Sequence, residues 1–259
     1  MTSSIITVPI RKIEGATATT EQDLLAVEEP LEIVVNGRNL AVTMRTPGHD
    51  RELAAGFLFT EGIVQNGSQI TAISHTGNRV EATVASAADF AERRFYLTSS
   101  CGVCGKASIE ALESIGCPFL DRSRPVIPAD LIPRLPAALR SGQSVFEHTG
   151  GLHAAALFDS GGQLLDLKED IGRHNAVDKL VGNAVLNGAA PLDRHILMLS
   201  GRAGFELIQK ALMAGIAIVA SVGAPSSLAV ETALRYGMTL AGFVRDGRYN
   251  VYSGQERLK

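Results

Sequence analysis

The sequence predicts a mixed α/β protein (α+β overall), in which a smaller N-terminal unit, mainly antiparallel β with one helix, precedes a three-layer α/β/α unit. Two observations predict this division. Short apolar runs of strand length dominate residues 21–98, whereas from residue 151 such runs alternate with amphipathic helical segments. Alternation of this kind is typical of helices layered on a sheet. We therefore expect a flexible arm over 1–20, a β-rich domain over 21–98, a cysteine loop with a proline-rich connection over 99–150, and an α/β/α domain over 151–259.

The N-terminal unit is predicted from two hairpins and a helix. Apolar runs over 31–35 and 40–44 flank Asn36-Gly37, a pair that tolerates the positive φ of a tight hairpin turn. Apolar residues at helical spacing over 53–58 follow, with Gly62 as a helix stop. The remaining expected elements are strands over 69–74, 79–84 and 94–98 and a short helix over 107–115.

Prolines are frequent in the middle of the chain, and predicted strands and helices alternate after them. The prolines at 118, 125, 128, 133 and 136 predict a linker or sheet edge over 117–136. Beyond the break at Thr149-Gly150-Gly151, the pattern predicts strands over 152–158, 164–167, 196–199, 217–222, 239–244 and 249–252, and helices over 175–187, 205–214 and 226–236.

Composition excludes several classes of function. The chain has 259 residues, 46% of them hydrophobic, and a formal net charge of −3, so general binding to nucleic acid or to an anionic membrane is not expected. No apolar stretch reaches the roughly 20 residues of a membrane span, and the first 20 residues lack the apolar core of a signal peptide. Three cysteines do not make a secreted disulfide framework, so we expect a cytoplasmic protein.

Cys101-Gly102-Val103-Cys104 is the first candidate for chemistry. Two thiols at this spacing can exchange a disulfide, ligate a metal or carry a sulfur atom as a persulfide, and the thiolate is the reacting species. Lys106 and the helix expected after it favour a lowered thiol pKa. Zinc normally takes four ligands, but the only other cysteine is Cys117 and the histidines lack paired ligand spacing. A reactive thiol is therefore favoured over a resident metal.

Three polar stretches are candidates for a ligand site. Residues 170–179 crowd polar groups at a helix start, which fits either capping with a solvated face or a ligand surface. Gly201 and Arg202 lie in a turn between a buried strand and a helix, which suits a phosphate or is an ordinary tight turn. Because residues 223–227 form a similar turn after the next strand, the pair of turns favours a ligand crevice.

The third stretch is Phe243-Val244-Arg245-Asp246-Gly247-Arg248. Its ring could stack on a base while its two guanidinium groups take phosphates. On residue types alone, a plain Asp-Gly hairpin with exposed arginines is the favoured interpretation.

Together these stretches resemble the FdhD family, the accessory proteins of formate dehydrogenases. The resemblance runs from about Leu31 to Tyr252, nearly the whole chain. It is carried by residues 44–50 (Met-Arg-Thr-Pro-Gly-His-Asp), 101–105 (Cys-Gly-Val-Cys-Gly), 172–179 (Gly-Arg-His-Asn-Ala-Val-Asp-Lys), and 200–202 (Ser-Gly-Arg) through Ser226-Ser227.

The resemblance implies a sulfurtransferase that acts between a cysteine desulfurase of the IscS type and the bis(molybdopterin guanine dinucleotide) molybdenum cofactor, for the benefit of a formate dehydrogenase. Carried over by position, Cys101 bears the persulfide and Cys104 assists it, while residues 243–248 belong to the region assigned to the cofactor. This raises the stacking-and-phosphate interpretation of 243–248 above the plain hairpin. The resemblance also implies a homodimer.

The family's C-terminal half is similar to the cytidine deaminase fold, and the order of elements expected here agrees. Zinc deaminases need His or Cys followed by Glu on one helix and Pro-Cys-x-x-Cys on the next. Here Asn175 and Ala176 follow His174, and the second helix opens on 201–204 without cysteine, so deamination is not expected. Two other functions stay open: a thiol–disulfide oxidoreductase using the same cysteines, and a cofactor chaperone that needs no thiol.

Overall fold

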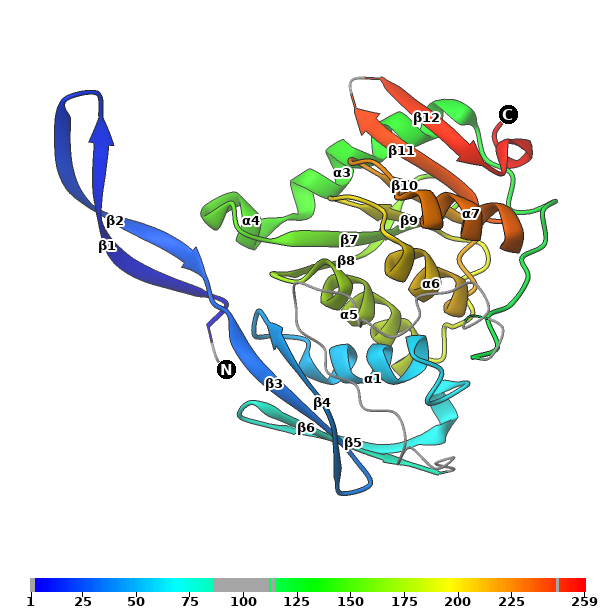
Figure 1. Ribbon diagram of the computed structural model, residues 1–259, viewed down its shortest axis with the longest axis horizontal. Coiled ribbons are helices and arrows are strands. Elements are labelled where there is room, and N and C mark those ends of the chain that lie inside the picture. Colours follow the sequence, from blue (N-terminus) through cyan, green and yellow to red (C-terminus); the bar gives the residue numbers. More distant parts are fainter. Residues whose placement is uncertain (1–2, 86–111, 113–114, 246) are drawn as a thin grey trace.

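The computed structural model of the protein describes residues 3–85, 112, 115–245 and 247–259 (Figure 1). The expected strand over 94–98, Cys101, Cys104 and Asp246 lie outside the described residues, as does most of the helix expected over 107–115. None of the helices in the described part of the chain is both long and apolar enough to span a membrane.

The first 20 residues differ from the expected loose arm. They form β1 (Ile5–Glu14) and the start of β2 (Thr17–Ala26), an antiparallel hairpin that turns at Gly15 and projects away from the rest of the molecule (Figure 1). Most of its residues are exposed on both faces, so the sequence lacks the apolar–polar alternation that marks a half-buried strand. The signal that remains is enrichment in Ile, Val and Thr, which favour strands.

The next sheet confirms both expected hairpins. Its strands are β3 (Glu29–Val35), β4 (Arg38–Arg45), β5 (Ile70–Thr76) and β6 (Arg79–Val84), in the order β4-β3-β6-β5. Asn36 and Gly37 have φ of 49° and 76°, as the tight turn requires. The central pairing of β3 with β6 is parallel, whereas the other two are antiparallel. The helix α1 (Asp50–Thr60) follows β4, as expected, and a short 3₁₀ turn (Gly67–Gln69) precedes β5.

A second, six-stranded sheet forms the centre of the C-terminal unit. Strands β9, β10 and β11 are mutually parallel, and β7, β8 and β12 run antiparallel to their neighbours. In sheet order the strands are β12 (Arg248–Ser253), β11 (Thr239–Arg245), β10 (Ile218–Ser221), β9 (Ile196–Leu199), β7 (His153–Phe158) and β8 (Leu164–Asp170). Every strand expected in this unit is present.

Helices cover both faces of this sheet, which gives three layers. One face packs against α5 (Arg173–Leu186), α6 (Phe205–Met213) and α7 (Ser227–Tyr236). The other face is covered by the 3₁₀ segment η3 (Ala129–Arg134) and α3 (Leu135–Gly142), which form a second core with β7, β9 and β10. Two short elements complete the chain: α4 (Ser144–Thr149) and a C-terminal 3₁₀ turn (Gln255–Arg257).

The second helical layer corrects the interpretation of the proline-rich segment. We expected a linker or edge over residues 117–136, but η3 and the start of α3 lie in it. Pro136 occupies the first turn of α3, where the missing N–H costs nothing, and Pro133 lies in a 3₁₀ segment rather than in an α-helix. Proline therefore marks helix starts here.

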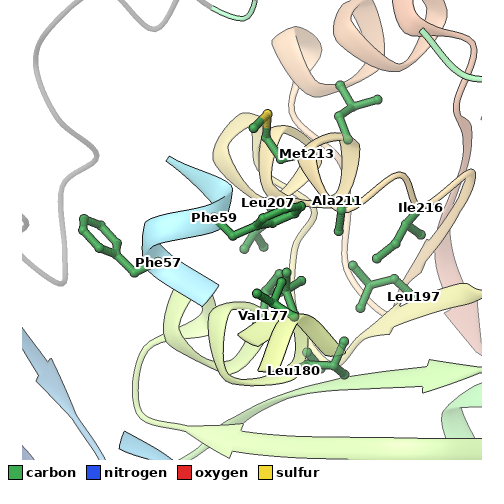
Figure 2. Close-up of a cluster of buried hydrophobic side chains, with 14 of the residues drawn as sticks. Phe57, Phe59, Val177, Leu180, Leu197, Leu207, Ala211, Met213 and Ile216 are labelled. Atoms are coloured by element: carbon green, nitrogen blue, oxygen red, sulfur yellow. The ribbon is translucent and has the colours of Figure 1, made fainter. Parts of the chain in front are cut away.

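The N-terminal and C-terminal units share one hydrophobic core, because α1 packs directly on α5. A Cβ placed on Gly56 of α1 would lie 1.8 Å from the carbonyl oxygen of Asp178, and one on Gly182 of α5 would lie 1.8 Å from that of Glu52. Only glycine permits so close a backbone approach. Figure 2 shows buried side chains from α1, α5 and α6 in a single cluster: Phe57, Phe59, Val177, Leu180, Leu207 and Met213.

Candidate ligand site at the carboxyl edge of the central sheet

The polar turns singled out in the sequence lie along one edge of the six-stranded sheet. Strands β9, β10 and β11 are parallel, so the segments that follow them leave the sheet at the same edge. Strand β7 is antiparallel to β9 and pairs His153 with Asp170 of β8, so both residues lie at that edge too. Ligands of open α/β sheets bind beyond the carboxyl ends of the strands.

The turns that follow β9 and β10 contact each other and β11. The amide of Gly223 donates a hydrogen bond of 3.0 Å to the carbonyl of Gly201, and the amide of Phe243 donates one of 3.1 Å to the carbonyl of Gly223. A Cβ placed on Gly223 would lie 3.0 Å from Cγ of Arg202. The structure therefore brings together Gly201, Arg202 and Phe243, as expected from neighbouring strand ends.

Phe243 has a backbone conformation that is rare for its residue type. Its φ is 54°, in the left-handed region, at an irregularity in the pairing of β11 with β12. The residue is 38% exposed, so its ring is accessible to a ligand. Strained positions of this kind persist only where the surroundings hold them, and they concentrate at ligand sites.

The other members of the 243–248 stretch divide by environment. Val244 is fully buried in the second core, so its side chain cannot reach a ligand and only its backbone remains available. Arg245 and Arg248 are exposed and lie directly opposite each other across β11 and β12. Gly247 has φ of 75° in the connecting turn. Two like charges in such a cross-strand pair repel, and an anion between them relieves that repulsion.

A second group of polar residues gathers near the turn after β9. His153 begins β7, and a Cβ placed on Gly201 would lie 3.2 Å from its Nδ1. His174, in the first turn of α5, places Nε2 at 3.9 Å from Oε2 of Glu206 in the first turn of α6. Residue types in the sequence drew attention to His174 but not to His153 or Glu206 as its neighbours, because three separate elements bring them together.

The charges in this group perturb one another. The His174 imidazole lowers the pKa of Glu206 to about 2, against an opposing effect of burial. Burial lowers the pKa of His153, and the positive charges of Arg173 and His174 lower it further. The pKa of the Glu206 carboxyl group is thus lowered, and the neutral form of His153 is favoured.

The polar side chains of Asp170, Asn175 and Lys179, from the 170–179 stretch, are buried and contact the N-terminal unit. Lys179 contacts Oδ2 of Asp170 at 2.7 Å and donates a hydrogen bond of 2.8 Å to the carbonyl of Thr46. The side-chain amide of Asn175 donates to the carbonyl of Met44 at 2.7 Å and to Oδ1 of Asp170 at 3.0 Å. Burial raises the pKa of Asp170, and Lys179 opposes that effect. These residues form a buried cross-link rather than a solvated face or a ligand surface.

A pocket of about 780 Å³ lies beside this cross-link, between the two units. His49 and Glu52 form one contact of 3.5 Å in its lining, and His75 and Asp50 form another of 3.3 Å. His49 has φ of 58° at the start of α1, a further non-glycine residue in the left-handed region. Sequence reasoning missed this pocket, because its walls come from distant parts of the chain.

Cys117 is the one cysteine in the part of the chain that the structure describes. It is buried, and burial raises the pKa of its thiol to about 12, with Glu61 adding to the effect. Because the thiolate is the nucleophile, Cys117 is chemically inert. Among the described residues no group of three or more His, Cys, Asp or Glu side chains could hold a metal ion.

The fold is that of a mixed α/β protein, and the carboxyl edge of its central sheet carries exposed arginines and an exposed aromatic ring as a candidate ligand site. The chain belongs to the FdhD/NarQ family, whose model matches residues 26–259. It is 48% identical over 262 residues to the sulfur carrier protein FdhD of Streptomyces avermitilis, covering 95% of this chain and 93% of that protein. It is 46% identical to the protein of the same name from Mycobacterium tuberculosis, over 96% of each chain.

A third relative and a solved structure are similar to nearly the whole chain. The sulfur carrier protein FdhD of Sulfolobus acidocaldarius is 42% identical over 97% of both chains. The crystal structure of a proposed formate dehydrogenase accessory protein from Desulfotalea psychrophila superimposes with a TM-score of 0.81 at 26% identity, covering 99% of this chain and 100% of that one. The expected family and the mixed α/β fold are thereby confirmed.

Proposed function

We propose that this protein is a cytoplasmic sulfur carrier that takes persulfide sulfur from a cysteine desulfurase onto Cys101 and passes it to the molybdenum of a bis(molybdopterin guanine dinucleotide) cofactor destined for a formate dehydrogenase. The observation that carries the proposal is near full-length identity of 42–48% with proteins named sulfur carrier protein FdhD. The name of the solved relative supplies the link to formate dehydrogenase.

The environment of Cys117 supports the assignment of Cys101, rather than Cys117, as the reactive thiol. The chain has three cysteines, and the buried, strongly protonated thiol of Cys117 is unsuited to accept sulfur. Cys101 and Cys104 are the two that remain. In the accepting step the Cys101 thiolate attacks the outer sulfur of the donor persulfide, a new S–S bond forms, and the desulfurase cysteine leaves as its thiolate. Cys104 is the assisting thiol.

Features at the carboxyl edge of the central sheet favour the molybdenum cofactor as the ligand that binds there. In this proposal the cofactor is the substrate of the protein. The exposed ring of Phe243 can stack on guanine, and the facing pair of Arg245 and Arg248 suits a phosphate. Arg202, close to the N-termini of α6 and α7, adds a second anion-binding position. A dinucleotide has both features, a base and a pyrophosphate.

A cofactor chaperone without sulfur transfer is the second candidate, because the ligand features described above need no thiol. Restoration of formate dehydrogenase activity in cells that lack their own accessory protein separates the two. Under the carrier proposal Cys101→Ala abolishes activation, while the control Cys117→Ala retains it. Activation by Cys101→Ala, combined with loss in Arg245→Ala/Arg248→Ala, would assign the chaperone role instead.

We also propose that the working unit is a homodimer. Light scattering of the purified protein after size exclusion tests this: a single species at the monomer mass of 27.4 kDa over micromolar concentrations would rule it out.

A further inference from the structure

Glu206 is an acidic side chain near the carboxyl edge of the six-stranded sheet, where the candidate ligand-binding side chains include several arginines. It lies in the first turn of α6, immediately after the turn that carries Gly201 and Arg202. Its side chain is 39% exposed, and His174 of α5 is its ion-pair partner, at 3.9 Å, among the described residues. The distance exceeds that of a hydrogen bond, and a carboxylate has about four lone-pair sites, so it retains acceptor capacity for N–H groups of a ligand.

The groups around Glu206 favour its ionised form. The contact with the His174 imidazole is the main cause that lowers the pKa of Glu206 to about 2, and the guanidinium of Arg173 lowers it further. An acidic residue in the first turn of a helix is common, because the helix dipole favours it. That preference does not explain the facing histidine on a different helix, or His153 packed beside Gly201 at the same edge.

An ionised carboxylate accepts hydrogen bonds and repels phosphates, so Glu206 suits a different part of the proposed ligand. Two oxygens side by side match a ring N–H next to an exocyclic amino group, in the way that arginine forks match carboxylates. The 2-amino-4-oxopyrimidine edge carries this pair of donors. It is present in guanine and in every pterin, and absent from adenine, from hypoxanthine and from lumazine.

We propose that Glu206, oriented by His174, binds the 2-amino-4-oxopyrimidine edge of the ligand and so selects for that ring. The inference rests on the proposed function, in which the substrate carries this edge at both ends. Phe243 lies in β11, whereas α6 follows β9, and two strand spacings of the sheet span about 10 Å. Because Glu206 faces α5, away from β11, a base stacked on Phe243 leaves the pterin end of the ligand for Glu206.

Paired ligands that differ only at the 2-amino group test this directly. Calorimetry measures the affinities of guanosine diphosphate and inosine diphosphate, and fluorescence titration measures those of pterin-6-carboxylate and lumazine-6-carboxylate. Wild type should prefer the amino-bearing member by about 10-fold or more, since a lost hydrogen bond to a charged group is worth about 1.5–3 kcal/mol. Glu206→Gln keeps the shape and should abolish that preference, while Glu231→Gln, on the exposed surface of α7, should retain it.

The two arms identify the ring. If Glu206→Gln loses the preference for pterin over lumazine, Glu206 binds the pterin end of the ligand. If it loses the preference for guanosine over inosine diphosphate, Glu206 binds the same edge of the guanine ring. An unchanged preference in both arms, with a variant whose circular dichroism matches wild type, would overturn the inference. So would the absence of any binding to wild type. Neither of those outcomes touches sulfur carriage by Cys101, which the activation of formate dehydrogenase tests separately.

Discussion

The ammonium group of Lys179 lies 2.7 Å from Oδ2 of Asp170 and donates a hydrogen bond of 2.8 Å to the carbonyl of Thr46. Both side chains are almost fully buried, at 2% and 0% exposure. The pair joins α5 and β8 to the segment between β4 and α1. It therefore holds the N-terminal unit against the sheet whose edge carries the candidate ligand site.

Removing one member of this pair should cost much of the protein's stability. Lys179→Met leaves Asp170 buried without its cation, so we expect the free energy of unfolding to fall by about 3–5 kcal/mol. Urea denaturation followed by circular dichroism measures this. Lys12→Met, on the exposed hairpin, is the control and should change stability by less than about 1 kcal/mol. A comparable loss in both variants would show that Lys179 has no special role.

The contact between α1 and α5 makes a steric prediction. A Cβ at Gly182 would lie 1.8 Å from the carbonyl oxygen of Glu52, so Gly182→Ala must push the two helices apart. We expect a loss of about 3 kcal/mol or more in the free energy of unfolding. At Gly151 a Cβ would have its nearest neighbour at 3.7 Å, and Gly151→Ala should be nearly neutral in the same denaturation experiment.

The thiol of Cys117 should not react with thiol reagents in the folded protein. In the double variant Cys101→Ala/Cys104→Ala it is the only thiol left, since the chain has three cysteines. Because burial raises the pKa of this thiol to about 12, a thiol reagent at pH 8 should detect essentially none in the native protein and one equivalent after unfolding. Rapid labelling of the native double variant would contradict the inert role given to Cys117.

The contact of His174 with Glu206 should be visible in a titration. Carbon-detected NMR of the Glu206 carboxyl group should give a pKa of about 2 in wild type and a value closer to 4.5 in His174→Gln. A carboxyl group whose pKa is lowered by folding stabilises the protein above about pH 4.5, and that stabilisation is lost as the pH falls towards 2. The variant should lack this particular loss between pH 4.5 and 2. If the pKa of Glu206 in His174→Gln stayed at its wild-type value, His174 would no longer be assigned as the orienting partner of Glu206.

Much of the fold could be predicted from the sequence because local signals agreed with burial. Asn36-Gly37 specifies a hairpin by its backbone freedom alone, and the four inner strands of the C-terminal sheet, β7, β9, β10 and β11, are short, mostly apolar runs between turn residues. The β1–β2 hairpin was missed because exposure on both faces removes alternation. The α3 layer was missed because prolines at a helix start look the same in sequence as prolines in a linker.

The candidate site, like the fold, has parts that the sequence predicts and parts that it does not. Gly201, Arg202 and Phe243 could be placed together, because strand order in a parallel sheet fixes which turns are neighbours. Val244 was included by sequence adjacency, and its burial follows from the alternation of side chains along β11. The roles of Glu206 and of the pocket around His49 depend on elements that meet only in three dimensions.

The most direct test of sulfur carriage is intact-protein mass spectrometry after incubation with a cysteine desulfurase and cysteine. The proposal predicts a gain of about 32 Da, one sulfur atom, that dithiothreitol reverses. The gain should be absent in Cys101→Ala and preserved in Cys117→Ala. No gain in wild type, with a desulfurase shown to be active on cysteine, or an equal gain in Cys101→Ala, would contradict the role of Cys101 as the sulfur carrier.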